Sequence, residues 1–321
     1  MTAYAEIGTA LATANTTFKA GYEKIFKNDL PGQYRRYTKV VPGNGRNILE
    51  IGGLRENPVV RQWTGARQHK AVQAFKNTIT AVPYEATLDF KRTEVQYDSP
   101  GVVAGKINAF LRETAYAYDK LAFAKLVSNP TAVDAVSLFS ASHPYGSSAG
   151  ATQSNYSTNS LTYANFETAR IAMESWLQAN DEPVQATVTT LLCGPALIRK
   201  AMEICDAALR VVPTNQAGAE AATLVVDTSA ISNVYQGKYT VVEDKRLVGD
   251  YAYYWFLIDE SRGEDSKPIV LLESMPFTPQ QLADIDSPFT YETDLFSYGL
   301  VADLGLGADA WQCIYGNLAT A

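Results

Sequence analysis

The sequence predicts an α+β fold in which one long helix is combined with shorter helices and several strands. Three observations support this prediction. Residues 102–128 repeat apolar side chains at helical spacing, strand-like segments are spread between residues 47 and 315, and no internal repeat is present. Helices and strands that follow one another without regular βα alternation are typical of the α+β class.

The first element in the chain is an N-terminal arm. Apolar side chains recur there at spacings of three and four residues, which predicts a helix, although Gly8 and Gly21 lower the helical propensity. The apolar positions are Ile7, Leu11, Ala14, Phe18, Tyr22 and Ile25. Turns are predicted at Leu30-Pro31-Gly32 and at residues 42–45.

The second element is a β-rich segment over residues 47–98. A short apolar run at residues 47–51 and an alternating stretch at residues 77–96 flank a polar, basic excursion. Two strands on either side of such an excursion predict a projecting, hairpin-like loop. An isolated two-stranded projection is marginally stable, so the loop is expected to need a partner surface.

The long helix follows directly. Asp98 and Ser99 are capping residues, and Pro100 suits a first helical turn. An apolar stripe then runs to about Ser128 and is interrupted only at Thr114. At about 1.5 Å per residue, roughly 27 residues make a rod of roughly 40 Å.

The remainder of the chain predicts a mixed α/β body. A small-residue loop spans residues 129–160, and Gly305-Leu306-Gly307 is interpreted as a turn between the last two strands. Helices are predicted at residues 163–179 and 195–209, and strands at residues 188–192, 239–242, 251–258, 268–272, 297–304 and 310–315.

Charge is distributed unevenly along the chain. The net charge is −7, yet residues 1–100 carry fourteen Lys and Arg against nine Asp and Glu. The last 54 residues contain seven acids and no Lys or Arg. This asymmetry fits either two ordinary solvated faces or a basic arm that lies on the acidic body of a neighbouring copy. The basic residues are too diluted by apolar ones to predict a strongly basic DNA-binding surface.

Several classes of protein are disfavoured. Three scattered cysteines with no CxxC pattern indicate neither a disulfide framework nor a zinc site. The N-terminus lacks the basic and apolar regions of a signal peptide, and no run of eighteen apolar residues predicts a membrane span.

The sequence offers little for catalysis, so we expect no enzyme activity, no cofactor and no metal site. The only histidines are His69 and His143, and no nucleotide-binding glycine motif is present. A Ser142-His143 hydrolase site, or a thiol site that combines His143 with Cys193 or Cys205, is weighed against a histidine in a turn, and the turn is favoured. Asp284 and Asp286 are interpreted as a solvated acidic loop rather than a cation site.

Several segments, taken together in their order, resemble the major head subunits of Mu-like phages, the gpT-like capsid proteins. The similarity covers residues 47–316 and includes the segment from Tyr84 to Gly101 that leads into the long helix. The other segments are Arg61-Gln62-Trp63-Thr64-Gly65-Ala66-Arg67, Leu138-Phe139, Ser142-His143-Pro144, Tyr298-Gly299, Trp311-Gln312 and Tyr315-Gly316. Asp303 departs from the basic residue that we expect in this family.

The resemblance implies an HK97-like capsid fold with an N-terminal arm, an extended β-loop, a long spine helix, and peripheral and axial domains. It divides the chain into an arm at residues 1–53, an extended loop at 54–84, a peripheral domain with the spine helix at 85–180, an axial domain at 181–265, and a return to the peripheral domain at 266–321. It implies inter-subunit contacts in the extended loop, at Arg61, Trp63, Arg67 and Lys70.

The function that the resemblance implies is that of a major head protein. Copies are expected to form pentamers and hexamers of an icosahedral shell in the virion, assembled in the cytoplasm of a bacterial host. Expected partners are a separate scaffolding protein, a portal, decoration proteins and packaged double-stranded DNA held without sequence-specific binding, with no membrane.

Three alternatives remain open. A cellular encapsulin-like nanocompartment shell would share the fold but enclose protein cargo. An enzyme would need a well-formed pocket with strongly shifted titrating groups. A single-stranded nucleic-acid binder would use the basic arm and the tyrosines near residue 253, and its binding would depend steeply on salt.

Overall fold

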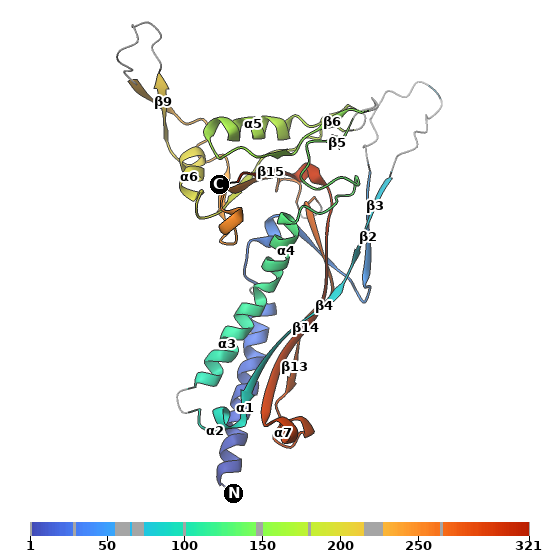
Figure 1. Ribbon diagram of the computed structural model, residues 1–321, viewed down its shortest axis with the longest axis vertical. Helices are drawn as coiled ribbons and strands as arrows, with labels where there is room; N and C mark the ends of the chain where they lie inside the picture. The colour runs from blue at the N-terminus through green and yellow to red at the C-terminus, as the bar shows by residue number, and fades with distance from the viewer. Residues whose placement is uncertain are drawn as a thin grey trace. The chain divides into compact units, whose positions relative to one another are not determined.

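The computed structural model describes residues 2–27, 30–54, 65, 74–98, 101–145, 150–178, 181–214, 227–263 and 266–320. The chain forms two compact units (Figure 1). Unit 1 comprises Met1–Ile51, Asn77–Pro130 and Ile269–Gly307, and unit 2 comprises Gly52–Lys76, Thr131–Pro268 and Ala308–Ala321. Each unit therefore draws on segments that lie far apart in the sequence.

Unit 1 is built on a four-stranded sheet of order β1-β13-β14-β4. These strands are β1 (Thr38–Pro42), β13 (Ile269–Leu282), β14 (Leu295–Ala308) and β4 (Val82–Lys91). Strand β1 is parallel to β13, and β14 is antiparallel to β4. A short two-stranded sheet pairs β2 (Ile48–Leu54) with β3 (Ala74–Thr80), as expected for strands that flank a projecting loop.

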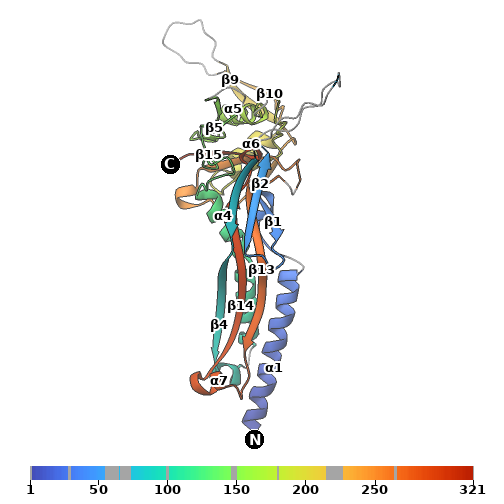
Figure 2. The same ribbon diagram turned by 90° about the vertical axis from the view of Figure 1, so that its right-hand side faces the viewer.

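Helices cover one face of this sheet, and α1 lies alongside it in Figure 2. The alternation along β14 buries every second side chain, including Phe296, Tyr298 and Leu300. The ring of Tyr298 packs 5.1 Å from that of Phe18 on α1, and its hydroxyl donates to Asn15 Oδ1 at 2.8 Å. The helices are α1 (Thr2–Tyr22), α2 (Arg92–Gln96), α3 (Val102–Ala115), α4 (Ala117–Val127) and α7 (Pro288–Thr293).

The predicted arm helix is confirmed as α1. Its apolar stripe is buried at Ile7, Leu11, Ala14 and Phe18. The helix approaches α3 closely at Gly21, where an added Cβ would lie 2.7 Å from Leu111 Cδ1. Gly21 therefore permits helix contact as well as lowering helical propensity.

The predicted long helix forms as two consecutive helices. Asp98 caps its start, since its Oδ1 accepts from the Val102 N–H at 2.7 Å. Helix α3 ends at Ala115 and α4 begins at Ala117, with Tyr116 between them. Near this break, Thr114 Oγ1 donates to the Phe110 carbonyl at 2.9 Å. Back-bonding of this kind to the preceding turn often bends a helix.

One sequence prediction about β14 is wrong. Gly305-Leu306-Gly307 does not form a turn but continues the strand to Ala308. An added Cβ would lie 2.8 Å from the Thr80 carbonyl oxygen at Gly305 and 2.5 Å from Ile79 Cγ1 at Gly307. The two glycines are needed because another segment crosses the strand closely.

Unit 2 contains a five-stranded sheet of order β11-β8-β12-β15-β7, with α5 (Tyr163–Glu174) and α6 (Ile198–Cys205) beside it. The strands are β11 (Thr240–Glu243), β8 (Thr190–Cys193), β12 (Tyr254–Ile258), β15 (Ile314–Leu318) and β7 (Tyr156–Ser157). Helix α5 buries Phe166, Ala169 and Met173, and Thr162 caps it by accepting from the Asn165 N–H at 3.2 Å. The antiparallel pair β9 (Leu209–Thr214) and β10 (Asp227–Ser232) and the short pair β5 (His143–Pro144) and β6 (Thr152–Gln153) complete the unit.

A buried carboxylate fixes the arm of unit 1 to the long helix. Asp119, on α4, accepts from the backbone N–H groups of Gln33 at 2.8 Å and Tyr34 at 3.0 Å. Gly32 has φ of +116°, and an added Cβ there would lie 2.5 Å from Asp119 Oδ1. The neighbouring Tyr118 donates its hydroxyl to Glu273 Oε1 at 2.5 Å, and burial raises the pKa of Tyr118 far above its usual value.

Replacement of Asp119 tests this attachment. Asp119→Ala removes a charged acceptor from two backbone N–H groups, so we expect the free energy of unfolding to fall by about 2–4 kcal/mol. Urea unfolding of the unassembled chain measures the change. The matched control is Lys120→Ala on the exposed side of the same helix, which should change stability by less than about 0.5 kcal/mol. Equal stability of the two variants would contradict the assigned role.

Candidate interaction surfaces

The described residues present no group of three or more His, Cys, Asp or Glu side chains placed to hold a metal ion. They also form no helix both long and apolar enough to cross a lipid bilayer. The candidate functional features are the buried His143 and the surfaces of each unit.

His143 lies fully buried in unit 2 within a polar network. Its Nδ1 is 2.7 Å from Asp134 Oδ2, its Nε2 is 3.1 Å from Asn155 Oδ1, and its ring stacks on Trp311 at 4.2 Å. The Asn155 amide donates to the Leu138 carbonyl at 2.7 Å, so its Oδ1 is the atom that faces the imidazole. Since that oxygen only accepts, Nε2 carries a proton and donates.

This network connects the segment around Ser140 to strand β15. Asn155 also donates to the carbonyl of Ile314 on β15 at 3.3 Å and accepts from the Ser140 N–H at 2.9 Å. Both ring nitrogens of His143 are engaged by Asp134 and Asn155, while Ser142 Oγ is 3.1 Å from Ser140 Oγ. The geometry supports a structural histidine and gives no support to a hydrolase or thiol site. The predicted turn is wrong, because His143 lies on the short strand β5 and pairs there with Gln153.

The three cysteines are free and buried. Burial raises the pKa of Cys193 to about 12, of Cys205 to about 12 and of Cys313 to about 11. Because the thiolate is the reactive form, the folded protein holds these groups in their unreactive state at neutral pH.

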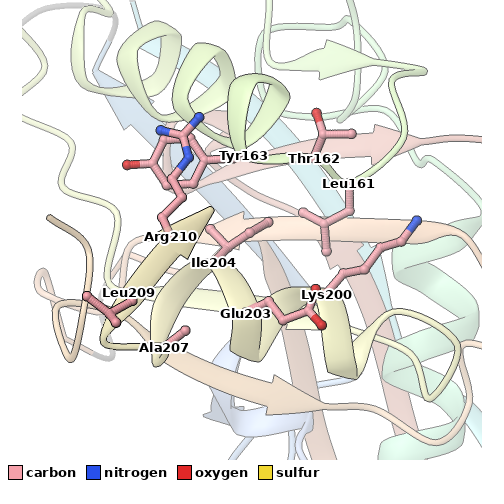
Figure 3. Close-up of a pocket in the computed structure, with 9 residues that line it drawn as sticks. All are labelled: Leu161, Thr162, Tyr163, Lys200, Glu203, Ile204, Ala207, Leu209 and Arg210. Carbon is pink, nitrogen blue, oxygen red and sulfur yellow. The ribbon is translucent and has the colours of Figure 1, made fainter. Parts of the chain in front are cut away.

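Unit 2 has a groove of about 650 Å³ (Figure 3). We call it the cationic groove. It is lined by Leu161, Tyr163, Lys200, Ile204, Leu209 and Arg210, together with Glu203. Leu161 and Ile204 are buried, whereas Leu209 is 60% exposed. The guanidinium of Arg210 lies 3.5 Å from the centroid of the Tyr163 ring, and Figure 3 shows it flat over that ring.

The exposed side chains of unit 1 carry both charge signs. On β4, Glu85, Asp89 and Lys91 occupy the exposed positions that alternate with the more buried row, and Asp303 on β14 is half-buried at an alternating position. The exposed side of α3 and α4 carries Lys106, Arg112, Glu113 and Lys120. Asp303, which departs from the expected basic residue, therefore adds a carboxylate to a face of mixed charge.

The four contact residues predicted from the sequence cannot be placed on either surface. Arg61, Trp63, Arg67 and Lys70 lie outside the described residues, between strands β2 and β3. The cationic groove was missed by sequence reasoning, because its residues come from separate segments around residues 162 and 205 and carry no motif.

Comparison with known proteins identifies similar sequences. The model of one protein family, Mu-like prophage major head subunit gpT, matches residues 11–162 and 232–320, well over half of the chain. The Mu-like prophage FluMu major head subunit of Haemophilus influenzae is 22% identical over 295 residues, which cover 91% of this chain and 69% of that protein. The major capsid protein of Escherichia phage Mu is 25% identical over 159 residues, 49% of this chain and 50% of that protein.

Solved structures show the same fold at low sequence identity. A chain of the procapsid of bacteriophage JBD30 superimposes with a TM-score of 0.55 at 19% identity, covering 97% of this chain and 74% of that one. A chain of the JBD30 capsid decorated with minor capsid protein trimers gives a TM-score of 0.50 at 18% identity, covering 69% of this chain and 94% of that one.

Thiol labelling tests the description of the cysteines. At pH 8, we expect a thiol-specific reagent to label the native protein at a rate at least ~100-fold below that of the urea-unfolded protein, because the reactive thiolate is disfavoured by burial. The unfolded sample is the control and should incorporate three labels, one for each cysteine. Rapid labelling of one thiol in the native protein would contradict this expectation and support the hypothesis of a reactive cysteine.

Proposed function

The chain belongs to the Mu-like prophage major head subunit family, and from that premise we propose that it is the major capsid protein of a tailed bacteriophage. The observation that carries this proposal is the family match, which runs through segments of both units. The fold is the HK97-like capsid fold, since phage capsid chains superimpose on most of the chain. In this role the protein self-assembles into the icosahedral shell around the genome.

The structure supports a mechanical role for unit 1. Helices α1, α3 and α4 and the sheet bury a continuous apolar layer, and the arm is fixed by Asp119. A plate held in this way transmits force between neighbours with little deformation, because close-packed interiors are barely compressible. We propose that residues 85–180 and 266–321 form the peripheral domain, which contains the spine helix, and that residues 181–265 form most of the axial domain. Of the first set, residues 131–180 and 308–321 belong to unit 2.

The extended loop, residues 54–84, is proposed to reach a neighbouring subunit. Residues 1–53 are proposed as the N-terminal arm, whose helix α1 and strand β1 pack within unit 1 of the same copy. Within that loop we propose that Arg61, Trp63, Arg67 and Lys70 contact the next copy. Many modest contacts, closed into pentamers, hexamers and then a shell, give strength through multivalency.

Further partners follow from the same role. We propose a separate scaffolding protein, a portal and decoration proteins, and the decorated JBD30 capsid offers a structural parallel for the last of these. Packaged double-stranded DNA is proposed to be held without sequence-specific contacts, which the net charge of −7 supports. The protein acts by assembly in the virion rather than by catalysis, and the shell is proposed to form in the host cytoplasm.

Particle microscopy tests the proposed function. The purified chain, produced with its phage assembly factors, should form closed shells or rings of five or six by negative-stain microscopy and light scattering. Shells recovered from phage should protect DNA from nuclease, whereas a nanocompartment shell would contain protein cargo. A stable monomer at high concentration, with and without those factors, would count against the capsid function.

Charge reversal tests the extended-loop contacts. Replacement of both Arg61 and Arg67 by Glu should reduce the yield of shells about tenfold or more, because repulsion replaces attraction at every copy of the contact. Lys245→Glu is the matched control, since Lys245 is exposed in unit 2 and does not line the cationic groove. Equal shell yields for the control and the double variant would show that these arginines do not contribute to the interface.

A further inference from the structure

The positive charge of the cationic groove favours binding of an acidic segment. Its carboxylate, Glu203, is already bonded to Arg199 Nε at 2.9 Å on the same helix. Lys200 is exposed at the groove, and Arg210 is held flat by Tyr163. Between these cations the floor is apolar, so a segment that presents carboxylates beside an apolar flank would match both features.

Unit 2 itself carries such a segment on a short turn after α5. Asp181 and Glu182 are both exposed there and are followed by Pro183 and Val184. The Gln178 N–H donates to the Glu182 carbonyl at 2.8 Å, and Leu177 forms a β-bridge with Pro183. These bonds fix the backbone at Glu182 and Pro183, so this part of the segment loses little conformational entropy on binding.

The turn is also anchored to the body of unit 2. Gln153, on β6, accepts from the Leu177 N–H at 3.0 Å and donates to the Leu177 carbonyl at 2.7 Å. The backbone of Asp181 has φ of +64°, which turns the chain sharply at the acidic pair. We call Asp181 and Glu182 in this turn the acidic turn.

Groove and turn lie at opposite ends of one helix. Thr162, the cap of α5, belongs to the groove, whereas Leu177 follows the other end of α5. A helix of twelve residues is about 18 Å long. Figure 1 shows α5 crossing unit 2, with β9 and α6 near one end and β5 and β6 near the other. Because the groove and the turn are separated by the length of α5, they cannot pair within one copy. The geometry therefore favours contact between two copies.

We propose that the cationic groove of one copy receives the acidic turn of the next copy in a ring. Lys200 and Arg210 pair with Asp181 and Glu182, and the apolar floor covers the flank of the turn. Because the two patches differ, the contact is heterologous, and repetition about a closing rotation generates a ring. This inference rests on the proposed function and adds the contact that builds a capsomer.

Covalent trapping in assembled particles tests the contact directly. A variant with Lys200→Cys and Glu182→Cys is assembled and treated with a short bismaleimide, and the products are separated under denaturing conditions. We expect a ladder of linked chains that ends at five or six. The native cysteines are buried and contribute little background. The matched control combines Lys245→Cys with Glu182→Cys, because Lys245 is exposed in unit 2 but does not line the groove, and its linked fraction should be at least about tenfold lower.

A charge exchange provides an independent measurement. Lys200→Glu and Glu182→Lys should each lower the yield of rings and shells about fivefold or more, and the combined variant should recover most of that yield because opposite charges face each other again. Lys245→Glu is the control, because it reverses an exposed charge in unit 2 that does not line the groove. Far-ultraviolet circular dichroism before assembly separates loss of contact from loss of fold.

The outcomes distinguish this inference from the proposed function. Normal shells without the cross-linked ladder, or single variants that assemble like the wild type, would overturn the groove-and-turn contact and leave the capsid function intact. Binding of a scaffolding segment or of nucleic acid in the groove, seen as protection of Lys200 from labelling in particles without cross-links to Glu182, would also overturn it. Failure of the wild type to assemble under any condition would overturn the capsid function itself.

Discussion

The architecture of unit 1 depends on one buried carboxylate. Asp119 binds the backbone of the turn at Gln33 and Tyr34, and this turn reverses the chain between the arm helix and strand β1. Three residues beyond Tyr34, the Tyr37 carbonyl accepts from the Ile269 N–H, and β1 then runs parallel to β13. A hydrogen bond to a charged group contributes about 1.5–3 kcal/mol, so the turn is held firmly enough to set the register of the strand that follows.

The helices of unit 1 could be predicted from local periodicity. The close contacts between segments that lie far apart in the sequence could not. The stripe that begins at Ile7 is buried against the sheet as its spacing indicates. Gly305 and Gly307 were interpreted as a turn because nothing nearby in the sequence reveals that Ile79 and Thr80 cross the strand. The groove escaped prediction for the same reason: Tyr163 and Arg210 are 47 positions apart and meet only through the packing of α5 against the base of β9.

The uneven charge along the chain does not correspond to separate charged domains in the fold. The basic first hundred residues and the acidic last segment do not form separate domains, because both contribute to unit 1. Some of the complementarity is satisfied inside a single copy, as in the 2.9 Å ion pair between Arg92 and Asp294. On the exposed surface the two signs are mixed, with Lys91 near Asp89 on the same face of β4 and Glu113 next to Arg112 on α3. Linear asymmetry therefore does not by itself identify which residues face a neighbour.

Small contacts of this kind suit a shell better than a stable dimer. An exposed ion pair contributes only about 0–1 kcal/mol, so Lys200 and Arg210 alone would not hold two free copies together. The exposed side chain of Leu209 adds apolar area to the groove, and its burial would contribute about 1–2 kcal/mol more. A single contact of that strength is reversible, which allows a misplaced subunit to leave. Once a ring closes, each copy is held on both sides, and loss of any one copy requires two contacts to break together.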